Sequence, residues 1–433
     1  MNTSRSLIIG AAAIGMALFV LILIGLLPGL KKNEPKNNPV SISIWGIGED
    51  NNFFADSATI LKTEYPNFSI QYRGFPDEES YNYALTEAFS LGKAPDIIML
   101  QNTDVPKMKS KIAQIPQQYI TQLQLQQAFP ETVWRYDFVD KNGVYALPFT
   151  IDTLTLFYNR DILGNVGIVY PPETWESLEA MIPKLTKKNA TGTIEQSAIA
   201  LGGTEQTIAH ASDILASLMI RTGTKMVSDD FSRASFNSSE GEDAFLFYTK
   251  FSDPESKMYT WNETMPYSLD AFVSEQVAMI VGYERDIKII RQKNQNLNFG
   301  IAPIPQPKLA TKTLTYPSYY GYAITNQSKQ KTIAASYLVR ATLDEATAQK
   351  YVEKVGGIPI LLSLINKDIS SAEKSVFARQ ALVARGYPQI DSTEIKAIFS
   401  EMIQLVISKT KTVQDALSEG QTNVNKLFLR RAL

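Results

Sequence analysis

Two strand-like apolar segments lie almost end to end near the middle of the chain. They are Val144–Phe149 and Leu154–Tyr158, and only the four residues Thr150–Thr153 separate them. Four residues are too few for the crossover that joins two parallel strands, and this link lacks the Asn-Gly or Gly-X pair that is typical of a tight hairpin. The two segments therefore fit neither of the usual connections between neighbouring strands, and the link between them carries one acid, Asp152.

The composition is that of a globular protein, and it excludes several kinds of site. A chain of 433 residues with 44% hydrophobic residues is long enough for about two to three core-forming units. The net charge is −2, and no segment interleaves Lys or Arg with aromatic residues, so we expect no binding of nucleic acid. The chain has no cysteine, a single histidine and no calcium-loop motif, so we expect neither a metal nor a cofactor.

The amino terminus carries a long apolar run, Leu7–Leu30. This run of 24 residues is uncharged, is long enough to span a bilayer and is longer than the apolar part of a usual signal peptide. No A-x-A-like cleavage site follows it. We therefore expect a transmembrane anchor at residues 7–30 after a short tail of residues 1–6, in preference to a cleaved signal. Residues 31–39 are polar and rich in Pro and Asn, and we expect them to form a tether.

The chain then alternates strand and helix patterns. Alternation predicts a strand at Ser41–Trp45, and strand-like segments follow at Phe68–Tyr72 and, as an apolar run, at Ile97–Leu100, with amphipathic helices between them. The first of these helices is expected to run from Phe54 to Tyr65. Strands that alternate with helices in this way predict a parallel sheet and an α/β fold, in which ligands bind beyond the carboxyl ends of the strands. Residues 45–50 and 101–104 are the loops at those ends.

The second half of the chain has a different pattern. From Thr174, which is expected to cap a helix, to about Lys250 the pattern is mainly helical. His210 lies in this stretch, in the first turns of an amphipathic helix, and we expect it to be a surface or packing histidine. Strand-like segments return at Phe299–Ile304 and Tyr319–Thr325, and the remainder is predicted to be helical.

Several short motifs follow one another in a characteristic order. They are ISIWG after the amino-terminal segment, KAPDIIML at Lys93–Leu100, GVYALPFTIDTLTLFYNRDIL at Gly143–Leu163, PPETWESL, FVSEQVAMIVG at Phe272–Gly282, FGIAPIPQPK, YYGYAITNQSKQKTIAASYLV at Tyr319–Val339, GGIPIL at Gly356–Leu361 and TVQDAL. Each is weak alone, but their order and spacing from about residue 41 to the carboxyl terminus resemble the family 1 extracellular solute-binding proteins of ABC importers, which include the maltose-binding protein.

This resemblance implies a periplasmic-binding-protein-like fold, with two α/β lobes joined by strands that pass between them. The first lobe would comprise residues 40–151 and 305–370, and the second residues 152–304 and 371–433. The two end-to-end strands would then lie in different lobes, with Asp152 at the passage between them. A monomeric receptor is implied, which holds a small solute, with carbohydrate favoured, in the cleft between the lobes and delivers it to ABC transporter permease subunits.

The resemblance also bears on where the protein resides. Arg5 precedes the apolar run while Lys31, Lys32 and Lys36 follow it, so a bare charge count would place the folded part in the cytoplasm. A solute receptor works on the outer face, and relatives without an anchor are commonly attached through a lipidated cysteine, which this chain lacks. We therefore expect a cell-membrane protein with a single-pass amino-terminal anchor and an extracytoplasmic binding domain.

Sugar binding needs planar hydrogen-bonding groups beside aromatic ring faces. The residues that match the family's binding positions or adjoin them are Trp45, Glu49, Asp50, Gln101, Asn102, Asp104, Asp152, Tyr283, Glu284, Arg285, Tyr319, Tyr320 and Glu394. Each also has a purely structural interpretation: Trp45 is as readily a core residue, and Asp152 could simply bridge the hinge. The chain has Leu100 and Glu394 where the maltose-binding protein has tryptophans, which argues against maltose itself. The acidic set would also suit a cationic solute such as a polyamine, an amino sugar or a basic peptide.

Two other classes of function are weighed against transport. An enzyme would need a catalytic constellation, and the chain has no P-loop, no G-x-S-x-G elbow and no complete Ser-Lys motif set. A glycosidase-like carboxylate pair could be drawn from Asp152 and Glu284, but it would require a raised pKa on one of them, which a sequence does not show. A sensor that binds a solute without feeding a transporter remains the other alternative. We therefore expect a binding protein and no enzyme.

Overall fold

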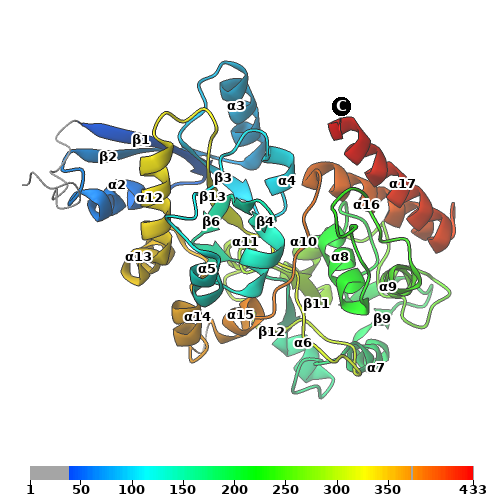
Figure 1. The fold of residues 1–433 in the computed structure, drawn as a ribbon. Coiled ribbons are helices and arrows are strands. Elements are labelled where there is room, and N and C mark those ends of the chain that lie inside the picture. Colours follow the sequence, from blue (N-terminus) through cyan, green and yellow to red (C-terminus); the bar gives the residue numbers. More distant parts are fainter. Residues whose placement is uncertain (1–38, 372–373, 433) are drawn as a thin grey trace, which may run out of the picture.

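The computed structural model describes residues 39–371 and 374–432 of the chain, which form an α/β structure built on two five-stranded sheets (Figure 1). The predicted tail and anchor lie outside the described residues, as does the predicted tether up to residue 38. Among the described helices, none is long and apolar enough to cross a membrane.

The first sheet has the strand order β2-β1-β3-β13-β6. In that order the strands are Phe68–Phe75, Val40–Ile47, Ile97–Gln101, Tyr320–Ile324 and Ala146–Pro148. β1 pairs in parallel with both β2 and β3, which confirms the parallel arrangement predicted from the strand–helix alternation. The alternation places Ile42 and Ile44 in the core, and both are at most 1% exposed. β13 is antiparallel to both of its neighbours.

Helices cover the first sheet, and Figure 1 shows them grouped with β1 and β2 on one side of the molecule. They are α2 (Phe53–Ser57), α3 (Glu78–Ser90), α12 (Lys331–Leu343) and α13 (Glu345–Val355). The first predicted helix is shorter than expected, because α2 tightens at Ala58–Leu61 into a 3₁₀ turn. Smaller elements complete this region: α4 (Val105–Met108), α5 (Gln122–Ala128), the π-helical turn η2 (Val133–Asp137), β4 (Val139–Asp140) and β5 (Gly143–Val144).

The second sheet has the strand order β12-β8-β11-β10-β9. In that order the strands are Phe299–Pro303, Thr155–Asn159, Val277–Gly282, Ile194–Ile199 and Lys187–Lys188. β10 lies inside the stretch that was expected to be mainly helical. It was missed because IEQSAI does not alternate apolar and polar residues. Its pairing with β11 joins residues about 80 positions apart, so no neighbouring segment indicates it either. The helices of this region are α6 (Arg160–Asn165), α7 (Trp175–Leu185), α8 (Ala211–Thr222), α9 (Ser239–Thr249), α10 (Ser268–Val273) and α11 (Asp286–Lys293).

The two end-to-end apolar segments belong to different sheets. β6 pairs with β13 in the first sheet, and β8 pairs with β11 and β12 in the second. Between them, the short strand β7 (Thr150–Ile151) pairs with β14 (Ile358–Pro359). The link was too short for a connection within one sheet because the chain passes here from one sheet to the other.

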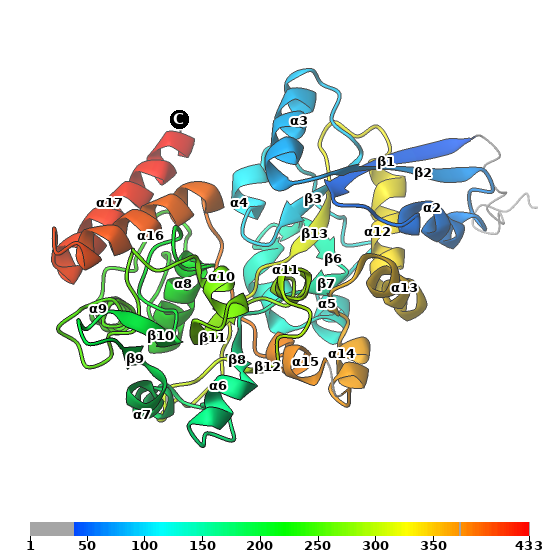
Figure 2. The same cartoon turned by 180° about the vertical axis from the view of Figure 1, so that it is seen from behind.

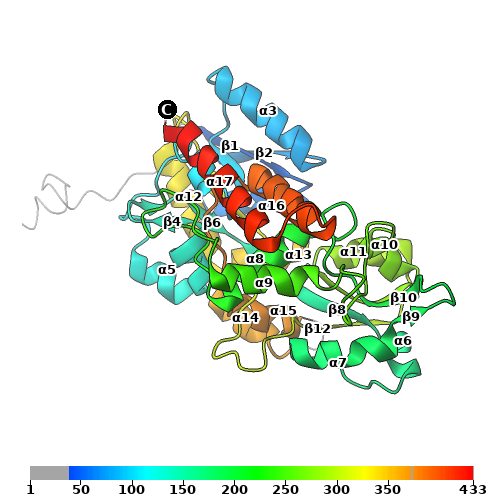
Figure 3. The same ribbon diagram turned by 90° about the vertical axis from the view of Figure 1, so that its right-hand side faces the viewer.

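The carboxyl-terminal helices lie against both regions. Their bounds are Leu362–Asp368 for α14, Ser375–Ala381 for α15, Ser392–Ile407 for α16 and Val413–Ala432 for α17. α16 contacts α8, α9 and α17, and α17 contacts α9, so this pair extends the second region (Figures 2 and 3). The segment before α16 passes close to the end of β3, where the backbone amide of Gln389 donates to the backbone carbonyl of Thr103 at 3.1 Å.

Candidate functional site

A cavity of about 840 Å³ lies between the two sheet regions. The first region contributes the end of β1, the start of α3 and the residues after β3, while the second contributes the starts of α8 and α16. Its lining residues are Ile47, Glu78, Glu79, Asn82, Gln101, Asn102, Thr103, His210, Ser212, Asp213, Ala216, Arg285, Tyr316, Pro317, Ser318, Tyr320, Tyr387, Gln389, Ser392, Thr393, Ile395, Lys396 and Phe399. The cavity thus lies at the carboxyl ends of the parallel strands, where α/β folds place ligands.

Four of the residues selected from the sequence line this cavity. They are Gln101, Asn102, Arg285 and Tyr320, and they come from the end of β3, the start of α11 and β13. Asp104 lies nearby, in the wall of a smaller hollow that also includes Gln101 and Tyr320. Burial raises the pKa of the Asp104 carboxyl, although the nearby Ser392 partly offsets that effect.

Asp152 lies behind the cavity wall, and hydrogen bonds engage both of its carboxylate oxygens. Oδ1 accepts from the backbone amides of Thr153 at 2.9 Å and Glu284 at 2.8 Å. Oδ2 accepts from the Arg285 backbone amide at 3.2 Å and from its guanidinium at 3.3 Å. Burial raises the pKa of this carboxyl, while Arg285 and the two amides before α11 oppose the rise. In this arrangement Asp152 joins the crossing between the sheets to the start of α11 and orients Arg285.

Tyr283 and Tyr319 are buried beneath the cavity and do not line it. The Tyr283 hydroxyl donates to Asp213 Oδ2 at 2.8 Å, and the Tyr319 hydroxyl donates to Asp137 Oδ2 at 2.7 Å. The Arg285 guanidinium lies over the Tyr283 ring, 4.0 Å from its centroid. Glu284 is half-buried, and burial raises the pKa of its carboxyl, with the charge of Asp152 adding to the rise.

The remaining four selected residues lie away from the cavity lining. Trp45 packs against Phe75, with the Arg73 guanidinium 4.7 Å from the Trp45 ring centroid. The Asp50 carboxylate accepts from the Asn52 and Phe54 backbone amides at the start of α2. Glu49 and Glu394 are exposed. For Trp45 and Asp50 the contacts favour the structural interpretations that were set beside their binding roles.

The helix starts of the second region supply residues that the sequence analysis did not select. His210 caps α8 with a left-handed backbone (φ 60°), lines the cavity and lies 2.9 Å from Asp286 Oδ2 through Nε2. Asp213 and Lys396 also line the wall, one turn inside α8 and α16. The sequence did not predict that His210 lines the cavity, because its hydrogen-bond partner Asp286 lies 76 residues away in the chain.

The aromatic side chains in the cavity wall are tyrosines and a phenylalanine, and among them Tyr320 is partly exposed while Tyr316, Tyr387 and Phe399 are buried. Tyr316, Tyr320, Tyr387 and Phe399 all line it. The Tyr316 hydroxyl accepts a hydrogen bond from Gln389 Nε2 at 2.9 Å, and the buried Tyr387 packs 6.3 Å from Tyr316, centroid to centroid. Tyr320 is therefore the ring that a solute could reach, and it stands beside amide groups, a combination that suits a hydroxyl-rich ring.

The basic side chains around the cavity are paired with acids of the protein. Arg285 pairs with Asp152, and Lys396 pairs with Glu205 at 3.3 Å. Asp213 has no ion-pair partner within the described chain, and burial raises the pKa of its carboxyl. Glu78 and Glu79 face the cavity from the first turn of α3. Glu78, Glu79 and Asp213 therefore form no ion pair among the described residues, although His210 and Lys396 lie close enough to Asp213 to offset part of the rise in the pKa of its carboxyl.

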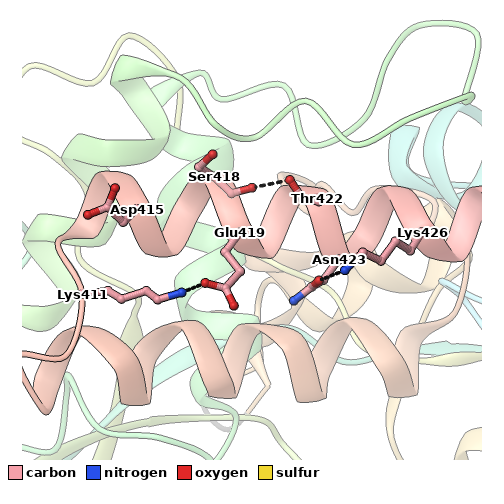
Figure 4. Close-up of a pocket in the computed structure, with 7 residues that line it drawn as sticks. All are labelled: Lys411, Asp415, Ser418, Glu419, Thr422, Asn423 and Lys426. Carbon is pink, nitrogen blue, oxygen red and sulfur yellow. Dashed lines mark hydrogen bonds and ion pairs between the residues drawn. The ribbon is translucent and has the colours of Figure 1, made fainter.

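Two other hollows lie outside this cavity. One of about 470 Å³ shares His210 and Arg285 with it and is otherwise lined by α10 and α11 and the residue before α10. The other, of about 430 Å³, lies on α17 and is lined by Lys411, Asp415, Ser418, Glu419, Thr422, Asn423 and Lys426 (Figure 4). Figure 4 shows the Lys411–Glu419 ion pair, a hydrogen bond from Lys426 to Asn423, and one from the Thr422 hydroxyl to the Ser418 backbone carbonyl. Because it draws on a single helix and its preceding turn, it lacks the two-sided character of the main cavity.

The site has the chemistry of a binding cleft. Asp152, one member of the glycosidase-like pair considered from the sequence, is engaged by four hydrogen bonds and does not line the cavity. Within residues 39–371 and 374–432, no cluster of three or more His, Asp or Glu side chains could hold a metal ion. The groups that do line it are hydrogen-bonding side chains and ring faces drawn from both sheet regions.

Comparisons with solved structures find the same architecture. The sugar-binding protein MalE from Xanthomonas citri matches with a TM-score of 0.73 and 17% identity, over 91% of this chain and 98% of that chain. The cyclic α-maltosyl-1,6-maltose binding protein from Arthrobacter globiformis matches with a TM-score of 0.73 and 18% identity, over 90% and 99% of the two chains. A solute-binding protein of an ABC transporter from Thermotoga lettingae, bound with α-D-tagatose, matches with a TM-score of 0.66 and 21% identity, over 90% and 99%.

At these identities the structural matches establish the periplasmic-binding-protein-like fold. The family is established by the sequence itself, because a family model described as bacterial extracellular solute-binding protein matches residues 57–378, about three-quarters of the chain. The match confirms the family relationship that the order of the motifs suggested. The chain belongs to the bacterial extracellular solute-binding protein family.

Proposed function

We propose that this protein captures a carbohydrate in the cavity between its two sheet regions and delivers it to the permease of an ABC importer. The observation that carries the proposal is the make-up of the cavity wall. It combines the partly exposed Tyr320 ring with the Gln101 and Asn102 amides and the Arg285 guanidinium, while the buried Tyr316 and Tyr387 are packed in the wall. Rings that stack on the apolar face of a pyranose, beside planar groups that bond its hydroxyls, suit an uncharged sugar. The sugar ligands named for the structural relatives support the same class.

The proposed mechanism is closure of one region against the other around the solute. We propose the lobe boundaries expected from the sequence, residues 40–151 with 305–370 and residues 152–304 with 371–433. A solute that touches Gln101 in the first and His210 in the second would favour the closed state only through contacts that it gains there. In this mechanism Asp152 stabilises the crossing between the sheets, and it orients the Arg285 side chain that lines the cavity.

A cationic sugar or a polyamine is the second candidate. Glu78, Glu79 and Asp213 line the cavity and form no ion pair among the described residues, whereas the lining Arg285 and Lys396 both pair with acids outside the lining. An amino group placed among these three carboxylates would gain Coulombic attraction that a neutral sugar does not. The two candidates are distinguished by salt, because screening weakens the binding of a charged solute far more than that of a neutral one.

A thermal-shift panel tests the proposal. Residues 40–433 are heated with maltotriose, D-tagatose, glucosamine, spermidine or a basic peptide, and a bound solute raises the midpoint by mass action. Tyr320→Ala should abolish the response, while Tyr83→Ala should not, because Tyr83 lies on α3 with its side chain 76% exposed. A flat response to every sugar in the panel would overturn the carbohydrate assignment, and a response to spermidine alone would establish the second candidate.

We also propose that residues 7–30 anchor the protein in the cell membrane, with the binding domain on the extracytoplasmic side. The length and the uncharged character of this run support the anchor, and membership of an extracellular family supports the orientation. Protease added to intact cells should digest the part from residue 40 onward. Protection of that part until the cells are lysed would overturn the orientation.

A further inference from the structure

A buried carboxyl group, Asp137, lies directly beneath the cavity floor. It ends the π-helical turn η2 and is 2% exposed. Its Oδ2 accepts two hydrogen bonds, from the Thr132 hydroxyl and from the Tyr319 hydroxyl, each at 2.7 Å. Its other oxygen, Oδ1, has no hydrogen-bond partner among the described residues. A buried carboxyl with one free oxygen is costly to keep, so its surroundings call for an explanation.

The free oxygen of Asp137 faces a side chain that lines the cavity. Asn102 is 1% exposed, and its Nδ2 is likewise without a hydrogen-bond partner among the described residues. Both atoms lie beside Gly386: a Cβ at that glycine would stand 2.5 Å from Asp137 Oδ1 and 3.5 Å from Asn102 Nδ2. The amide oxygen of Asn102 is already used, because it accepts from the Tyr319 backbone amide at 3.3 Å. The Asn102 side chain is therefore held between Tyr319 and Asp137.

The protonation state of the Asp137 carboxyl decides whether its Oδ1 and the Asn102 Nδ2 can pair as acceptor and donor. When it is ionised, Oδ1 is an acceptor that faces the donor Nδ2. When it is protonated, the proton resides on Oδ1, because Oδ2 already receives two hydroxyl donors. An O–H group then faces an N–H₂ group. Turning the amide over relieves that conflict but sets Nδ2 against the Tyr319 amide, so one contact of Asn102 is lost in either orientation.

We propose that Asp137 is a positioning residue of the solute site, whose ionised carboxylate holds the Asn102 side chain at the cavity floor and whose protonation releases it and weakens solute binding. The inference rests on the proposed function, since Asn102 matters only if the cavity takes a solute. The same contacts reach the far side of the cavity. The Gly386 amide lies 3.4 Å from the Thr132 hydroxyl, and the Gln389 amide donates to the Thr103 carbonyl at 3.1 Å. Gln389 and Tyr387, which line the cavity, are thus tied to the same floor.

The surroundings of Asp137 place its titration in the physiological range. Burial raises its pKa from 3.8 to about 7, and the Thr132 and Tyr319 hydroxyls and the Asn102 amide offset only part of the rise. No ion pair involves Asp137 in the described residues. The titratable groups around it are Tyr319, to which it is bonded, and Tyr316 on the adjoining crossing segment. Arg385, next to Gly386, turns its guanidinium over the Tyr136 ring.

The decisive experiment needs no solute. Protein with ¹⁵N-labelled asparagine is titrated between about pH 5.5 and 8.5, and the side-chain amide resonances of Asn102, assigned by their loss in Asn102→Ser, are followed. The wild type should show an inflection near pH 7. Asp137→Asn should remove it, and Asp140→Asn should retain it, because Asp140 is three residues further on and pairs with Lys109 instead. Resonances that stay constant in the wild type, or that titrate unchanged in Asp137→Asn, would overturn the proposal.

A second variant covers the case in which Asp137→Asn does not fold. Tyr319→Phe removes one hydroxyl donor to Oδ2, and since that donor lowers the pKa of Asp137, the inflection should move to higher pH. The solute arm uses maltotriose: its dissociation constant should rise by about fivefold from pH 8 to pH 6 in the wild type and stay level in Asp137→Asn. If maltotriose does not bind at any pH, the proposed function fails for this sugar while the NMR titration still decides the role of Asp137.

Discussion

Replacing Asp152 by alanine tests whether this residue holds the crossing between the sheets together or binds the solute. The structure favours the first role. Its carboxylate is 14% exposed and receives hydrogen bonds from the backbone amides of Thr153, Glu284 and Arg285 and from the Arg285 guanidinium. Asp152→Ala leaves the amides before α11 without their acceptor and frees Arg285 from its partner.

The expected loss follows from these contacts. Removing an acceptor at the start of a helix costs about 0.5 to 2 kcal/mol. The Arg285 side chain is 45% exposed, so its ion pair with Asp152 contributes less than about 1 kcal/mol in water. Burial of the carboxylate opposes its ionisation, and alanine relieves that cost. We therefore expect Asp152→Ala to lower the free energy of unfolding by about 2 kcal/mol and, through the displaced Arg285, to weaken solute binding.

Urea unfolding of residues 40–433 at neutral pH, followed by circular dichroism, measures the first quantity, and the solute identified by the thermal-shift panel measures the second. Glu64→Ala is the matched control. Glu64 pairs with Arg340 at the surface, where both side chains are more than 40% exposed, so its loss should cost less than about 1 kcal/mol. An unchanged free energy of unfolding together with a large loss of affinity would refute this argument and make Asp152 a direct solute ligand.

Three further substitutions test the site's electrostatics and packing. Burial acts to raise the pKa of Asp286, but the hydrogen bond to His210 and the Tyr283 amide hold it below its ordinary value, so Asp286→Asn should destabilise the protein at neutral pH by about 1 to 2 kcal/mol. Because a lowered pKa stabilises only above the unfolded-state value of 3.8, urea unfolding should show this difference shrinking as the pH falls below about 4. The pKa of Asp137 is raised instead, from 3.8 to about 7, so the wild type should lose about 3 kcal/mol of unfolding free energy between pH 4 and 7 as this carboxyl ionises. A decline of the same size in Asp137→Asn would contradict the assignment. Gly386→Ala forces a methyl group against Asp137 Oδ1 and should cost about 1 to 3 kcal/mol in the same assay, whereas full stability would show that the segment moves freely aside.

The site was partly accessible from sequence. Gln101 and Asn102 follow a strand that a short apolar run identifies, and in a parallel sheet such residues lie at the ligand edge. Tyr320 and Arg285 follow from the order of the family's motifs. The polar wall on the other side did not follow, because His210, Asp213 and Lys396 occupy the first turns of amphipathic helices. From the sequence, such residues cannot be distinguished from solvent-exposed helix residues, because the other side of the cavity is formed by a part of the chain far away in sequence.

The sequence alone determined the family and most of the strands and helices named in advance, because strand patterns, helix caps and the order of motifs are local properties of the chain, while β10 was missed. It also determined that the segment around Asp152 joins strands that are not neighbours, since four residues cannot make a crossover. Only the tertiary structure decided which side chains face the cavity and which support it from behind. Asp152 meets Glu284 across 132 positions, and Tyr319 meets Asp137 across 182. Contacts at such separations depend on how the two sheets pack, and no local pattern records that packing.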